Sequence, residues 1–164
     1  MVKREVLVLG CMLIISALAV SVFAASSDFD TATASVIINQ FISVTLTSGS
    51  PIDFGNMDPG QSLKNATNNP LNITIGSETN VDFTISTKAN STTFKSGSNT
   101  FAVGNLNWND DSFATKTNYT TSDVAVYSTQ TSPREYSIYH ELAIPTPQKA
   151  GDYNVGVIIT AAAV

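Results

Sequence analysis

Apolar residues recur at every second position over long stretches of this chain, and this alternation constrains the fold more than any other feature. From Val36 to Leu46 the even-numbered residues are apolar, with Gln40 as the only exception. A period of two is typical of a β-strand with one buried face. The stretch predicts one long strand, or two strands with a bulge. We find no helical period after residue 25, so the chain is predicted to be all-β.

Further alternating segments follow, separated by turn-forming residues such as Asp58-Pro59-Gly60, where Pro fixes φ and Gly tolerates a positive φ. Residues 71–75 and 81–85 are predicted to pair as a hairpin around a turn at 76–80. Residues 88–99 are expected to be a polar connection with Phe94 embedded in it. Other strands are expected at the following places: 52–54, 101–108, around 124–126, 136–144 and 153–159.

Each expected strand has one apolar face and one face rich in Ser, Thr and Asn. Seven to nine such strands with turns between them predict an antiparallel β-sandwich of Ig-like or jelly-roll-like type. We find no internal repeat and no second block of composition. The expected division is therefore a leader at 1–24, an N-terminal extension at 25–35 and one sandwich domain at 36–164.

The first 24 residues have the order of a secretory signal peptide. Lys3 and Arg4 precede an apolar run from Val6 to Val20, and small residues precede a cleavage point between Ala24 and Ala25. The run is shorter than the roughly 20 apolar residues of a membrane span. We therefore expect export to the cell surface, with contact to the membrane only during export. An uncleaved N-terminal anchor is the main alternative; lipidation at Cys11 and a prepilin leader fit less well.

Cleavage after Ala24 would leave an acidic chain without cysteine. The eight basic and thirteen acidic residues would become six and twelve, because Lys3, Arg4 and Glu5 are removed, which gives a net charge of −6. Such a chain repels phosphate backbones, so no nucleic-acid partner is expected. Without disulfides, burial of a core or contacts to a neighbour must stabilise the fold.

No group of residues has the pattern of a catalytic, cofactor or metal site, and we do not expect an enzyme. His140 is the only histidine, and it shares the parity of Ile138 and Leu142, which predicts a half-buried histidine in a sheet. A single histidine without cysteine partners disfavours zinc and copper sites. Asp110-Asp111 and Asp28-Phe29-Asp30 lack the spacing of an EF-hand loop.

Trp108, flanked by Asn107 and Asn109, is compatible with an exposed sugar-stacking site. We favour an aromatic plug at the edge of the sandwich, since sugar platforms usually need more than one aromatic residue.

Four Asn-x-Ser/Thr sequons are candidate N-glycosylation sites. Asn65, Asn90 and Asn118 fall in expected loops, and Asn72 is expected to point away from the apolar face of its strand.

The N-terminal extension is polar and contains neither Gly nor Pro. It is compatible with a strand that is donated to the groove of another subunit. The residues that would belong to such a strand are Phe29, Thr31, Thr33, Val36 and Ile38. A disordered leader and an edge strand of its own sheet are the alternatives.

Several segments are similar to parts of known filament subunits. They are the leader, Ala34–Ile38, Ile52–Gly60, and the closing stretches Leu142–Pro145 and Ala150–Tyr153. The chain resembles donor-strand β-sandwich pilins of archaeal bundling pili and threads, and the related bacterial biofilm-matrix fibre proteins. The resemblance implies a homopolymer built by donor-strand exchange, often with N-glycans.

Our leading hypothesis is therefore a structural subunit of an extracellular filament, with copies of itself as partners and other envelope proteins or glycans as further candidates. The alternative is a monomeric secreted binding or adhesion module associated with carbohydrate or the envelope.

Overall fold

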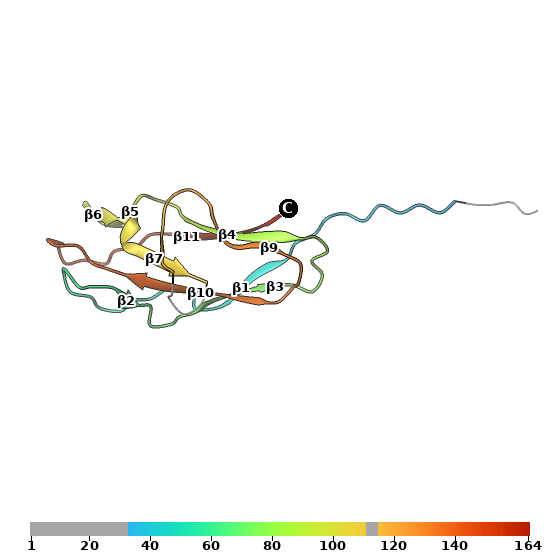
Figure 1. Ribbon diagram of the computed structural model, residues 1–164. Helices are drawn as coiled ribbons and strands as arrows, with labels where there is room; N and C mark the ends of the chain where they lie inside the picture. Colours follow the sequence, from blue (N-terminus) through green and yellow to red (C-terminus); the bar gives the residue numbers. More distant parts are fainter. Residues whose placement is uncertain (1–32, 111–114) are drawn as a thin grey trace, which may run out of the picture. The chain divides into compact units, whose positions relative to one another are not determined.

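The computed structural model describes residues 33–110 and 115–164 (Figure 1). The expected leader, its cleavage point between Ala24 and Ala25, and the candidate donor residues Phe29 and Thr31 lie outside this range. The chain divides into two compact units between Ile37 and Ile38. Of the first unit, only residues 33–37 are described, and they form neither helix nor strand.

The second unit contains two larger antiparallel sheets and one small one. The first sheet has the strand order β1 (Val44–Ser48), β3 (Leu71–Ile75), β10 (Glu135–Leu142), β7 (Leu106–Asn109) and β8 (Thr117–Asn118), and β2 (Lys64–Asn65) also pairs with β10. The second sheet has the order β11 (Val157–Ala163), β4 (Phe83–Ala89) and β9 (Val124–Gln130). The hairpin of β5 (Thr93–Ser96) and β6 (Asn99–Ala102) leads into the 3₁₀ turn η1 (Val103–Asn105).

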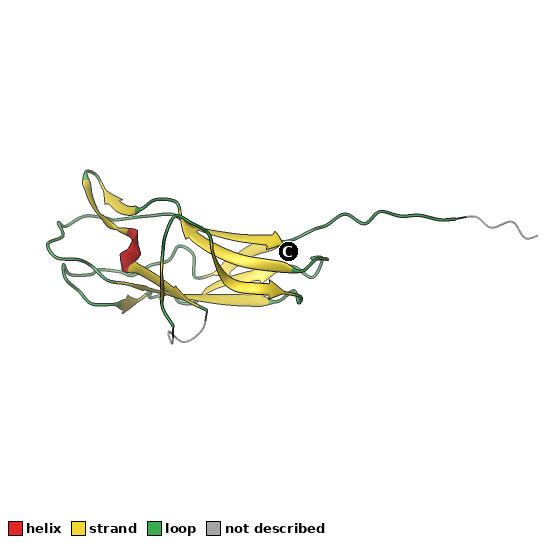
Figure 2. Cartoon of the chain, turned by 45° about the horizontal axis from the view of Figure 1, so that its top comes forward, coloured by secondary structure: helices red, strands yellow, loops and turns green. Residues whose placement is uncertain are grey.

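The two larger sheets pack against each other through their apolar faces. Figure 1 shows β4, β9 and β11 in one layer and β1, β3 and β10 in the other, and Figure 2 shows the same layers after rotation. Ile73 and Ile138 of the first sheet and Phe83 and Ile85 of the second are fully buried in one cluster. The prediction of an all-β chain with antiparallel strands is confirmed, and the arrangement is sandwich-like. No α-helix occurs in the described ranges, and no helix there is long and apolar enough to cross a membrane.

The predicted hairpin of residues 71–75 and 81–85 is wrong, because β3 and β4 belong to different sheets. Both strands present an apolar row to the same core from opposite sides, so residues 76–80 cross between the layers. Asn80 is held by residues that precede β1. It accepts a hydrogen bond from the Phe41 amide at 2.8 Å, and its side-chain amide donates to the Asn39 carbonyl at 2.9 Å.

Several strand boundaries also differ from expectation. The long strand predicted from Val36 is limited to β1, since residues 39–43 bond to the crossing at 76–80 instead. Residues 52–54 form no strand, and the last strand begins at Val157. The expected connection at 88–99 contains β5, because Phe94 stacks on Phe101 with ring centroids 4.6 Å apart. The described residues form eleven strands against the seven to nine expected, and two of these have only two residues.

Candidate functional site

One lateral side of the two-layer unit is closed by contacts between the sheets. The amide of Ala89 in β4 donates to the carbonyl of Thr120, just beyond β8, at 2.8 Å. The hydroxyl of Tyr127 in β9 donates to the Ser137 carbonyl of β10 at 2.6 Å. Hydrogen bonds of this kind connect the two layers on this side.

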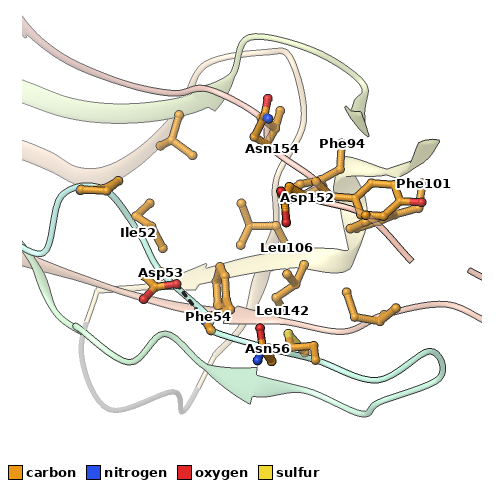
Figure 3. Close-up of a pocket in the computed structure, with 18 of the residues that line it drawn as sticks. Ile52, Asp53, Phe54, Asn56, Phe94, Phe101, Leu106, Leu142, Asp152 and Asn154 are labelled. Atoms are coloured by element: carbon orange, nitrogen blue, oxygen red, sulfur yellow. Dashed lines mark hydrogen bonds between the residues drawn. The ribbon is translucent and has the colours of Figure 1, made fainter. Parts of the chain in front are cut away.

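The opposite side carries an open groove of about 770 Å³ (Figure 3). Residues 50–59 and 148–155 supply most of its lining, β1 contributes Leu46, and β11 contributes Val157 and Ile159. Its apolar walls come from both sheets and are formed by Leu46, Leu71, Leu106, Leu142, Val157 and Ile159. Leu46 is 46% exposed although it pairs with Ile73, a residue on the buried face of β3. The groove therefore leaves the side of the core uncovered along β1.

The segment that follows β1 forms one rim of the groove, and hydrogen bonds hold it in place. Lys64 Nζ donates to the carbonyls of Phe54 at 2.6 Å and Asn56 at 3.0 Å. The carbonyl of Asp53 accepts from the amide of Thr67 at 2.7 Å. Figure 3 shows the side chains of Leu106 and Leu142 between this rim and the aromatic rings of Phe94 and Phe101. These contacts with Lys64 and Thr67 fix residues 53–56 of the rim.

An aromatic cluster closes the far end of the groove. Phe101 lies between Phe94 and Tyr153, at centroid distances of 4.6 Å and 5.2 Å. Asn154 and Lys95 exchange two backbone hydrogen bonds of 3.1 Å, which fix the chain ahead of β11. Polar and charged side chains also line the groove, and the charged ones are Asp53, Asp58, Lys149 and Asp152. A lining of this mixed kind suits an extended segment that presents apolar side chains together with backbone polar groups.

The same chain carries an exposed apolar segment. Val36, Ile37 and Ile38 are 83%, 91% and 77% exposed, and Thr33 is exposed as well. No charged residue occurs from residue 33 to residue 38. Three consecutive β-branched side chains favour an extended strand, and here they leave a run of apolar surface exposed.

No protein-family model matches this sequence, and comparisons with curated proteins and with solved structures found no match.

His140 lies in the interior, where it was expected to be half-buried. Its Nε2 lies 2.9 Å from the Tyr119 hydroxyl, which in turn lies 3.1 Å from Thr87 Oγ1. Thr87 Oγ1 also lies 3.3 Å from the Ile158 carbonyl, so the chain of polar groups runs from β10 to β11. Burial lowers the pKa of His140 to about 4 and raises the pKa of Tyr119. A neutral histidine that connects the two layers is a structural element of the core.

Trp108 is 7% exposed and belongs to the core cluster, which contradicts an exposed sugar-stacking site. It lies in β7, which pairs with β10 and β8, and so not in an edge strand as expected.

The sequons divide into two pairs. Asn65 and Asn118 are exposed and lie in the short strands β2 and β8, where loops had been expected. Register places both beside buried polar residues of the first sheet, since Asn65 pairs with Glu141 and Asn118 with Asn107. Their side chains therefore share the outer face.

The other two sequons are engaged in hydrogen bonds. Asn72 alternates with the buried residues of β3, as expected, and its Oδ1 accepts from Ser137 Oγ at 2.8 Å. Asn90 directly follows β4, and its Oδ1 accepts from the Gly156 amide at 2.9 Å.

The sequence pattern predicted Val36 and Ile38 as candidate donor residues, and it gave no sign of the groove. The walls of the groove come from strands far apart in the chain, and no local pattern indicates that β1 and β11 form neighbouring edges of the two layers.

Proposed function

We propose that this protein is a structural subunit of an extracellular or cell-surface filament, in which the apolar segment of one copy occupies the groove of the next. The observation that carries the proposal is the presence of an open apolar groove and an exposed, uncharged apolar segment in one chain. The groove leaves apolar side chains of the core uncovered, and the segment exposes apolar side chains of its own. Binding of the segment in the groove would remove both apolar surfaces from water.

Burial of the segment supplies a driving force for assembly. Full burial of a Val or Ile side chain is worth about 1.5–3 kcal/mol, so Val36 and Ile38 together contribute several kcal/mol. An added strand also satisfies the backbone groups of a free sheet edge, which otherwise risk unspecific aggregation. Because residues 33–38 carry no charge, the acidic residues around the groove do not repel them.

Segment and groove are two different surfaces, so the contact between copies is head-to-tail. A head-to-tail contact that does not close into a ring produces an open filament. The expected leader supports export, and the resemblance to donor-strand pilins supports the finer description as an Ig-like or jelly-roll-like sandwich subunit. In this description the donated strand extends towards Thr33, Thr31 and Phe29.

Size-exclusion chromatography and negative-stain microscopy of the purified exported protein test the proposal. We expect polymers or fibres, and we expect the double substitution Val36→Asp, Ile38→Asp to leave a folded monomer. Ser35→Asp is the matched control, because it adds a charge beside the same residues without removing an apolar side chain. Polymers that survive the double substitution, or a stable monomer of the unchanged protein, would argue for the monomeric binding module instead.

A further inference from the structure

We infer that the incoming segment pairs with β11 and extends the second sheet, and that it does not pair with β1. This inference rests on the proposed function, in which a second copy fills the groove. It names the strand edge that receives the partner, which decides how one copy is oriented on the next.

The ladder between β11 and β4 shows which backbone groups of β11 are available. All seven residues of β11 pair with β4 without a register shift. The Gly156 carbonyl accepts from the Asn90 amide, and the Val164 amide donates to the Asp82 carbonyl. The backbone N–H and C=O groups of the even-numbered residues therefore point towards β4. In an antiparallel ladder the alternate residues then point away.

The edge-facing residues of β11 are therefore Val157, Ile159, Ala161 and Ala163. Within residues 33–110 and 115–164, no strand pairs with this side of β11. An unpaired strand edge is usually protected by charge or by Pro, and β11 (VIITAAA) has neither. Its free side is a regular template for one more strand.

The edge of β1 is shorter and less regular. The Ser43 carbonyl accepts from the Gly76 amide, so the backbone N–H and C=O groups of Ser43 and Thr45 point towards β3. Only Val44 and Leu46 direct their backbone N–H and C=O groups away from β3 before the register shifts between Leu46 and Ser48. After β1 the chain continues as the rim segment, residues 53–56, which is hydrogen-bonded to Lys64 and Thr67. This segment lies where a further strand beside β1 would have to continue.

Side-chain chemistry favours the same edge. Val157 and Ile159 line the groove, so a strand beside β11 can direct Val36 and Ile38 into the same groove. Ile37 then falls on the outer face, where Ile158 is 39% exposed. A cross-strand pair of β-branched residues stabilises a sheet. The outer face of β1 offers only Thr45 and Thr47 to Ile37.

Cysteine cross-linking between copies distinguishes the two edges. The background is the full chain with Cys11→Ser, so that introduced thiols are the only ones. Copies with Ile37→Cys are mixed with copies that carry one acceptor cysteine and are then oxidised. The acceptors on β11 are Ile158→Cys, Thr160→Cys and Ala162→Cys, and the matched controls on β1 are Thr45→Cys and Thr47→Cys. Linked chains are read by non-reducing electrophoresis and by mass spectrometry of the joined peptides.

We expect disulfide-linked dimers with at least one acceptor on β11 and none with those on β1. Polymers that link to β1, or that link to neither edge, would overturn the inference and leave the proposed function intact. Absence of polymers in microscopy before oxidation would overturn both. Circular dichroism confirms that each variant is folded, and three acceptor positions ensure that failure of one variant does not decide the outcome.

Discussion

The hydroxyl of Tyr119 lies 2.9 Å from Nε2 of His140, and these two buried residues form the centre of a polar connection between the sheets. Nδ1 of His140 has no hydrogen-bond partner among the described residues. Desolvation in the core disfavours the charged imidazolium, and this burial lowers the pKa of His140 and holds the ring neutral.

Stability is expected to fall in mild acid because of His140. The pKa of this side chain is about 4 in the folded chain and 6.5 at its ordinary value. Between these pH values the unfolded chain binds more protons, so the free energy of unfolding decreases as the pH falls from about 6.5 to about 4. The expected loss is on the order of 3 kcal/mol, with no further contribution below this window. Urea titrations of the monomeric Val36→Asp, Ile38→Asp variant at several pH values measure it.

Carboxylates titrate in part of the same window, so His140→Gln in that background is the control. We expect the free energy of unfolding of the His140→Gln variant to fall less between pH 6.5 and 4, because the contribution of the histidine is absent. Equal slopes in both proteins would contradict the assignment.

Removal of the Tyr119 hydroxyl is expected to weaken the connection between the layers. Tyr119→Phe keeps the ring in place and leaves His140 Nε2 without its partner, at a cost of about 1–3 kcal/mol. Thr87→Val removes the next group, whose hydroxyl lies 3.1 Å from Tyr119. Because the groups belong to one network, we expect the two effects to be non-additive in a double-mutant cycle. Strict additivity in thermal or urea unfolding would show that they act independently.

Gly49 is expected to be irreplaceable at the end of β1. Its φ is +77°, and an added Cβ would meet the backbone of Pro70 and Leu71. Gly49→Ala should therefore lower the free energy of unfolding by more than about 1 kcal/mol. Gly97 is the matched control: its φ is +59°, but an added Cβ has nothing within 4 Å. If Gly97→Ala is as harmful as Gly49→Ala, backbone conformation alone would account for both losses.

The sequons are expected to differ in glycan occupancy when the chain is exported by a host with N-glycosylation machinery. Asn65 and Asn118 form the first pair and are exposed. In the second pair Asn72 is half-buried and Asn90 is exposed, and each accepts a hydrogen bond through Oδ1. We expect higher occupancy at the first pair in glycopeptide mass spectrometry. Asn65→Gln and Asn118→Gln together should remove most of the glycan mass, and Asn72→Gln with Asn90→Gln is the control. Predominant glycan at Asn90 would contradict this order.

The side chains that face the core within a strand could be predicted from the alternation of apolar residues in the sequence. Ile138 and His140 were placed on one parity by the sequence, and both are fully buried in β10. Alternation predicts such rows because successive side chains of an extended chain point to opposite faces, whichever strand lies beside them. The candidate donor residues Val36 and Ile38 were found by the same signal.

Which strands became neighbours was decided only by the tertiary structure. The short link at 76–80 is compatible with a hairpin as well as with a crossing between layers, and packing of Ile75 and Phe83 into one core selected the crossing. The groove depends on β1 and β11, which are far apart in sequence and lie at the edges of different sheets. The alternation of side chains is a local property of the backbone, whereas the identity of an unpaired edge depends on every other pairing in the fold.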